Sequence, residues 1–126
     1  ERPGAPMTIH DMPEDERPIS EQFRITSKHW IAADHEYRHF EETKTPELET
    51  RKHALIEAAT PDDKMTDAKA ERIVKASQEW RDYIRQLVEA KTKANRFQMQ
   101  MEYIRMRQWE INDANASKRA EMGLTR

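Results

Sequence analysis

The sequence contains no cysteine and only two glycines among its 126 residues. The absence of cysteine excludes disulfides and thiolate metal sites. The scarcity of glycine excludes glycine-rich phosphate loops and the glycine-flanked serine of many hydrolases. No apolar run approaches the roughly 20 residues of a membrane span, and no signal peptide is recognisable. We therefore expect a soluble, cytoplasmic protein that is not an enzyme, holds no cofactor and has no contact with a membrane.

Charged residues are abundant and unevenly distributed. They make up 37% of the chain, against 36% for hydrophobic residues, which favours long helices with a narrow apolar seam. Residues 1–63 carry 8 basic and 15 acidic side chains, whereas residues 64–126 carry 14 and 9. This asymmetry has two interpretations: the halves face each other in a hairpin or an oligomer, or the basic half meets a polyanion.

Apolar side chains recur every three or four residues along two long segments, which predicts two amphipathic helices. The first is expected from Ser20 to a turn at residues 60–64, with a kink or short break at Pro46. The second is capped by Ser77 and stops at Gly123. A short helix with the sequence DAKAERIVKA is expected between them. The predicted apolar seam consists of Trp30, Tyr37, Phe40, Leu87, Phe97, Met101 and Ile104.

No segment alternates apolar and polar residues with period two, so no strand is predicted. The expected fold class is all-α: a long antiparallel helical hairpin, coiled-coil-like, with a short helix at the turn. Residues 20–126 are predicted to form this single domain. The proline-rich residues 1–19 are expected to form a disordered or loosely docked arm, with Met7 interpreted as the natural start. Because so thin a seam buries little apolar surface, we expect a homo-oligomer.

The segment His35-Glu36-Tyr37-Arg38-His39 matches the H-E-x-x-H motif of zinc peptidases. On a helical wheel, however, both histidines fall about 130° or more from the centre of the predicted seam. A catalytic zinc also needs a third protein ligand and a cleft; Glu57 is the only carboxylate at a vaguely suitable distance downstream, and no cleft is predicted. We interpret the segment as an exposed helix face, with Tyr37 in the seam, and expect neither a metal site nor catalysis.

A basic stretch at residues 91–109 is the strongest candidate for a binding site. It carries five basic side chains and one acidic side chain, Glu102. Most of its polar side chains share one face of the helix, where the cations could follow phosphates and a tyrosine could stack on a base. A solvated face, a helix-pairing face and a peptide-binding face are the alternatives. The predicted nucleic-acid contacts are Lys93, Arg96, Gln100, Tyr103, Arg105 and Arg107.

The segment EWRDYIRQLVEAKTKANRFQMQMEYIRMRQWE at residues 79–110, with ASKRAEM after it, resembles small helical proteins of tailed phages and prophages. Some of these are encoded beside single-strand annealing or exonuclease genes. The order of helices over residues 20–122 also resembles recombination mediators of the UvsY type. Those proteins are helical, oligomeric and bind single-stranded DNA, loading a recombinase while displacing a single-strand binding protein.

This resemblance implies a non-enzymatic, phage-type accessory protein in DNA recombination or replication, which binds single-stranded DNA as an oligomer. Its other partner would be a recombinase or a single-strand binding protein. The four basic residues among the predicted contacts would then meet phosphates, and Tyr103 would stack on a base. The alternative is a coiled-coil adaptor or structural protein that acts only through protein–protein contacts.

Overall fold

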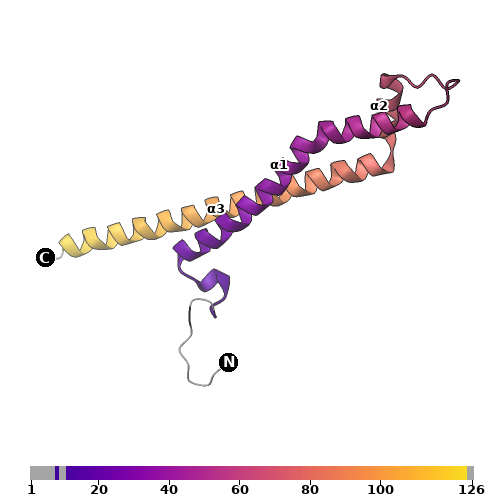
Figure 1. Cartoon of the computed structure of the whole chain (residues 1–126). Coiled ribbons are helices and arrows are strands. Elements are labelled where there is room, and N and C mark those ends of the chain that lie inside the picture. Colours follow the sequence, from indigo (N-terminus) through magenta and orange to yellow (C-terminus); the bar gives the residue numbers. More distant parts are fainter. Residues whose placement is uncertain (1–7, 9–10, 125–126) are drawn as a thin grey trace. The chain divides into compact units, whose positions relative to one another are not determined.

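A computed structural model describes residue 8 and residues 11–124 of the chain (Figure 1). No strand occurs within these residues, so the prediction of an all-α protein is confirmed, as is that of two long helices and a short one. The residues that the structure leaves undescribed include Met7 and most of the first ten positions of the expected arm. The elements are the 3₁₀ turn η1 (Glu14–Glu16), α1 (Ile19–Ala58), α2 (Asp67–Ala76) and α3 (Gln78–Leu124).

The chain forms two compact units, which we describe separately. Unit 1 comprises the described residues of segments 1–30 and 95–126, and unit 2 comprises residues 31–94. Each unit contains one segment of α1 and one segment of α3. In both units these segments run antiparallel, because residues later in α1 contact residues earlier in α3.

The core of unit 2 combines small and large apolar side chains. Ala33 of α1 is 2% exposed, and Ala90 and Ala94 of α3 are each 5% exposed. Such small side chains allow two helix backbones to approach closely. Trp80 and Leu87 are also buried and supply most of the apolar area of this part of α3.

Tyr83 ties α3 to α1 beside the proline of α1. Its hydroxyl donates to the carbonyl oxygen of Phe40 at 2.9 Å and lies 2.8 Å from the hydroxyl oxygen of Thr43. The rings of Tyr83 and Phe40 meet edge to face, with their centroids 5.7 Å apart. These contacts lie within two helical turns of Pro46, which cannot donate a helical hydrogen bond. Helix α1 nevertheless continues through Pro46, so the short break that we considered there is wrong.

Helix α2 is bounded by hydroxyl side chains at both ends. The Thr66 side chain accepts a hydrogen bond from the backbone N–H of Lys69 at 3.1 Å, which caps the first turn. Ser77 ends α2 by donating its hydroxyl to the carbonyl oxygen of Val74, and it accepts from the backbone N–H of Trp80 at the start of α3. One serine therefore separates the two helices. Ala70 and Val74 are the buried residues of α2.

Lys52 is a buried cation that connects α1 to the start of α2. Its ammonium group lies 2.9 Å from a carboxylate oxygen of Asp67 and 3.1 Å from one of Glu49. The hydrogen bond that Lys52 donates to Asp67, followed by the one that it donates to Glu49, raises the pKa of Lys52 above its ordinary value. Both carboxylates are more than half exposed, so water reaches the acidic side of this cluster.

The core of unit 1 is more polar than that of unit 2. Two of the three buried side chains among its described residues are polar: Gln22 is 6% exposed and Thr26 is 2% exposed. The third is Ile104, at 3%. Half-buried aromatic and sulfur-containing side chains complete the seam: Phe97 stacks on His29 with ring centroids 5.4 Å apart, and Met101 accepts a hydrogen bond from the Ser27 hydroxyl at 3.3 Å.

Two further boundaries differ slightly from the sequence-based expectation. Helix α1 begins at Ile19, one residue before the expected cap, and α3 passes through Gly123 to Leu124. Within the described residues no helix combines the length and the apolar character that a membrane crossing requires.

Candidate nucleic-acid interface

Most of the predicted binding residues lie on the segment of α3 that belongs to unit 1. This segment contains no proline, and its apolar side chains at three- and four-residue intervals hold one face against α1. Ile104 and Met101 lie on that face, which leaves the remaining circumference of α3 for polar groups. Arg96, Gln100 and Tyr103 are exposed there, with Tyr103 at 60%.

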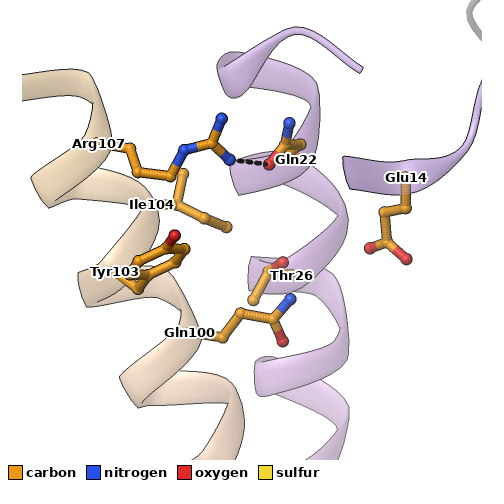
Figure 2. A pocket seen from close by; sticks show the side chains of 7 residues that line it. All are labelled: Glu14, Gln22, Thr26, Gln100, Tyr103, Ile104 and Arg107. Atoms are coloured by element: carbon orange, nitrogen blue, oxygen red, sulfur yellow. Dashed lines mark hydrogen bonds between the residues drawn. The ribbon is translucent and has the colours of Figure 1, made fainter. Parts of the chain in front are cut away.

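A recess of about 320 Å³ lies between α1 and α3 of unit 1. Figure 2 shows that Tyr103 and Gln100 approach it from α3, whereas Glu14 stands at its edge on the segment before α1. Amide, hydroxyl, phenol, guanidinium and carboxylate groups therefore border one small space, together with apolar surface that includes Ile104. The lining residues are Glu14, Gln22, Thr26, Gln100, Tyr103, Ile104 and Arg107.

The side chain of Gln22 links three parts of unit 1. Its amide nitrogen donates to the carbonyl oxygen of Arg17 at 2.6 Å, and its amide oxygen accepts from a guanidinium nitrogen of Arg107 at 3.3 Å (Figure 2). The Arg17 side chain in turn donates to the carbonyl oxygen of Met12 at 3.1 Å. The segment that precedes α1 is therefore connected to α3 by a continuous series of hydrogen bonds. Because Gln22 is buried, these bonds are protected from competition with water.

Three arginines of this α3 segment have no acidic partner. In the part of the chain that the structure describes, no ion pair involves Arg96, Arg105 or Arg107. For Arg96 the sequence explains this, because no carboxylate occurs three or four residues away on either side. The charges of these three arginines are consequently not neutralised by an ion pair within the described part of the chain.

The arginines of α1 are arranged differently. Arg24 pairs with Glu21, Arg38 pairs with Asp34 at 2.8 Å, and Arg51 pairs with Glu47 at 2.9 Å, all within the same helix. The hydrogen bond and charge of Glu21 raise the pKa of Arg24 above its ordinary value, although that pair is exposed and screened by solvent. The charges of these three arginines are thus already compensated locally.

Arg105 and Arg107 lie on opposite flanks of the seam. Two residues correspond to about 200° around a helix, so their side chains leave α3 on different sides. Arg107 is half-buried beside Gln22, whereas Arg105 places its guanidinium 5.3 Å from the ring centroid of Phe23. Arg107 shares the recess with Gln100 and Tyr103, and Arg105 does not line it.

Lys93, the sixth predicted contact, belongs to unit 2 rather than to unit 1. It is exposed and borders a separate recess of about 230 Å³. Glu36 and Glu89 border the same recess, so the local potential at Lys93 is less positive than at Arg96. Five of the six predicted nucleic-acid contacts therefore lie on the α3 segment of unit 1, and the sixth, Lys93, lies in unit 2 beside two glutamates.

The predicted seam residues occupy interior or half-interior positions. Leu87 and Ile104 are buried, and the other five are half-buried: Trp30, Tyr37, Phe40, Phe97 and Met101. Sequence reasoning missed Trp80, Gln22 and Thr26, all of which are buried. Trp80 precedes Tyr83 by three residues and stacks on it, so the same periodicity extended by one step would have identified it. For Gln22 no signal in the sequence separates it from an exposed glutamine.

The histidines of the H-E-x-x-H segment, His35 and His39, are both exposed. Within the described residues no three histidine, aspartate or glutamate side chains gather in a way that could hold a metal ion. The H-E-x-x-H segment therefore places its two histidines on the exposed surface of α1. Comparison with known proteins identifies no relative: no family model, no curated protein and no solved structure matches the chain.

Proposed function

We propose that this protein binds single-stranded nucleic acid through α3 of unit 1. The observation that supports this proposal is a contrast between two helices. The arginines of this α3 segment have no carboxylate partner and lie near an exposed tyrosine, whereas the arginines of α1 are all paired. Cationic side chains attract the phosphate backbone and release its condensed counterions. An exposed ring provides a surface on which a base can stack.

The spacing of these groups suits an extended strand. From Arg96 to Arg107 the helix rises by about 16 Å, at 1.5 Å per residue. Gln100 and Tyr103 lie between them, one and two turns from Arg96. A strand that follows this face meets cation, amide, ring and cation in turn, which supports binding without requiring a particular base sequence.

The biological role that agrees with this arrangement is that of an accessory protein in DNA recombination or replication, of the kind encoded by phages. It acts in the cytoplasm on single-stranded DNA, alongside a recombinase or a single-strand binding protein, and performs no catalysis itself. A coiled-coil-like assembly of several copies would place several α3 faces along one strand. Linked sites of this kind raise avidity without new types of contact.

A protein-binding adaptor is the second candidate, and one observation favours it. Met99, Met106 and Trp109 on α3 of unit 1 are 70%, 61% and 79% exposed. Exposed methionine and tryptophan side chains are enriched at protein interfaces. On this alternative α3 contacts another protein, and the arginines only keep the helix soluble.

Titration of fluorescently labelled single-stranded DNA at two salt concentrations tests the proposal. Wild type is expected to bind, with an affinity that falls as salt rises. The double variant Arg96→Glu/Arg107→Glu reverses two charges at the proposed site and is expected to weaken binding at least tenfold. Because Arg107 also contacts Gln22, Arg96→Glu alone serves as the variant that leaves that contact intact.

The matched control is Arg38→Glu, which makes the same charge change on α1 at an arginine paired with Asp34. It is expected to reduce affinity much less than Arg96→Glu does. Equal losses in the two variants would indicate a nonspecific response to net charge. Absent or salt-independent binding by wild type would reject nucleic acid as the ligand and favour the adaptor.

A further inference from the structure

The seam of α3 follows a seven-residue repeat. Starting at Trp80, alternating steps of three and four residues lead through the whole helix to Met122. All five buried apolar residues of α3 fall on this repeat: Trp80, Leu87, Ala90, Ala94 and Ile104. Such a pattern is typical of helices that pack with coiled-coil geometry. The next positions of the repeat are Gln108, Ile111, Asn115, Lys118 and Met122.

Helix α1 does not extend far enough to cover these last positions. In unit 1, Gln22 lies near the beginning of α1 and contacts Arg107, and α1 begins at Ile19. Every residue from 109 to 124 is exposed, including Ile111 at 43% and Met122 at 62%. The repeat that is buried against α1 at Ile104 therefore continues, among the described residues, as a row of exposed side chains past the point where α1 begins.

The segment past the beginning of α1 continues α3 and needs no new helix nucleus, so its stability depends on helix propensity and on packing of its apolar face. The uncovered segment contains two asparagines, an aspartate, a serine and a glycine, all of which have low helix propensity. Its helical form is thus expected to depend on a partner that packs on the repeat.

We propose that residues 108–124, the tail segment, pair antiparallel with the same segment of a second copy. In the register that places apolar side chains opposite apolar ones, Ile111 packs on Met122 of the second copy. Asn115 then faces Lys118 of the second copy, so that the amide oxygen accepts from the ammonium group and neither is buried unpaired. The two-fold axis generates each of these two pairs twice, so the same surface of both copies forms the interface, which is isologous.

The antiparallel direction follows from Lys118. A parallel pair in register would place Lys118 against its own copy and bring two like charges together in the seam. The antiparallel pair separates the two lysines and provides each with an amide. The tail segment carries Glu110, Asp113 and Glu121 against Lys118 and Arg119, so its charge is nearly balanced and two copies do not repel. Self-pairing also continues the seam that already packs within the chain.

This inference specifies the oligomer that the proposed function uses, and it does not depend on DNA binding. Light scattering and sedimentation of the full chain test it. Wild type is expected to be a dimer at micromolar concentration, and Ile111→Asp is expected to raise the dissociation constant at least tenfold. Ala120→Asp adds the same charge to the opposite side of the tail segment and is expected to leave the dimer unchanged. Met122→Asp provides a second seam variant.

A monomeric wild type, or equal behaviour of Ile111→Asp and Ala120→Asp, would overturn the proposal. Direction is tested separately, because a chain without cysteine accepts single cysteines as clean probes. A mixture of Asn115→Cys and Lys118→Cys proteins is expected to form the mixed disulfide faster than either protein alone forms its own. Faster homodisulfides would indicate a parallel pair and overturn the antiparallel arrangement.

The two proposals fail in different ways. If the tail segment does not self-associate, wild type is monomeric but still binds single-stranded DNA in a salt-dependent manner. If the nucleic-acid proposal is wrong, the dimer forms and Ile111→Asp dissociates it, but no DNA binds. The same protein preparations serve both measurements.

Discussion

The two units of this chain use the same pairing of α1 with α3 and fill it with different chemistry. Unit 2 encloses alanines, Leu87 and Trp80 of the long helices, and Ala70 and Val74 of α2. Unit 1 encloses Gln22 and Thr26, and leaves a recess between its helices. An apolar seam stabilises by area removed from water. A polar seam gains little free energy from burial of apolar area, but it positions hydrogen-bonding groups.

This comparison indicates a division of roles within one helical chain. Unit 2 is expected to supply most of the folding free energy. Unit 1 holds unpaired arginines, an exposed ring and a hydrogen-bonded connection to the segment before α1, which are features of binding. If this division is correct, substitutions in unit 2 change stability and substitutions in unit 1 change binding.

The largest expected effect on stability comes from Trp80→Ala in unit 2. Trp80 is 6% exposed and stacks on Tyr83 at 5.4 Å, so truncation removes a large buried area and leaves a cavity. We expect a loss of about 3 kcal/mol in the free energy of unfolding. Urea denaturation followed by circular dichroism measures it. A loss below about 1 kcal/mol would show that unit 2 is not the stabilising part.

A smaller effect is expected from enlarging the closely packed alanine of α1. Ala33→Leu forces extra volume between α1 and α3 and is expected to cost about 1–3 kcal/mol. The neighbouring Ala32 is exposed, and Ala32→Leu is expected to change stability by less than about 0.5 kcal/mol. Thermal unfolding of the two variants, Ala33→Leu and Ala32→Leu, compares the two positions directly. If Ala33→Leu is as stable as Ala32→Leu, the helices of unit 2 are not in close contact.

The smallest effect on stability is expected from Gln22→Leu in unit 1. The new apolar side chain fills a similar space, and the half-buried Arg107 can turn to solvent, so loss of the hydrogen bonds to Arg17 and Arg107 should lower the free energy of unfolding by only about 1 kcal/mol. The connection of the preceding segment to α3 is broken, however. Hydrogen exchange at residues 11–18 should therefore become faster while that of unit 2 is unchanged. Uniform acceleration in both units would contradict the division of roles.

The sequence predicted the parts of the fold that depend on periodicity. The two long helices, the short helix and the serine cap at Ser77 follow from apolar spacing and from hydroxyl side chains at helix starts. Of the two alternatives at Pro46, only the break was wrong, because a helix can continue through a proline when other contacts hold the adjacent turn, as Tyr83 does here. The buried glutamine of unit 1 could not be predicted, because its role depends on tertiary contacts from two other segments.

The candidate site was predictable in composition and not in arrangement. A count of charges at helical spacing identified Arg96, and the same count shows why it has no acidic partner. The position of Arg107 beside Gln22 and of Arg105 over Phe23 depends on how α1 packs on α3. The assignment of Lys93 to the other unit depends on the packing as well.

The most direct test of the central claim, that unpaired cations of α3 bind the phosphates of a single strand, is the salt dependence of binding. The logarithm of the association constant is measured against the logarithm of salt concentration for wild type, Arg96→Gln and Arg38→Gln. We expect a linear decrease whose slope becomes shallower by about 0.7 in Arg96→Gln, the value for one lost contact to a single strand, and stays unchanged in Arg38→Gln. The same slope in all three proteins, or no binding at all, would contradict the account.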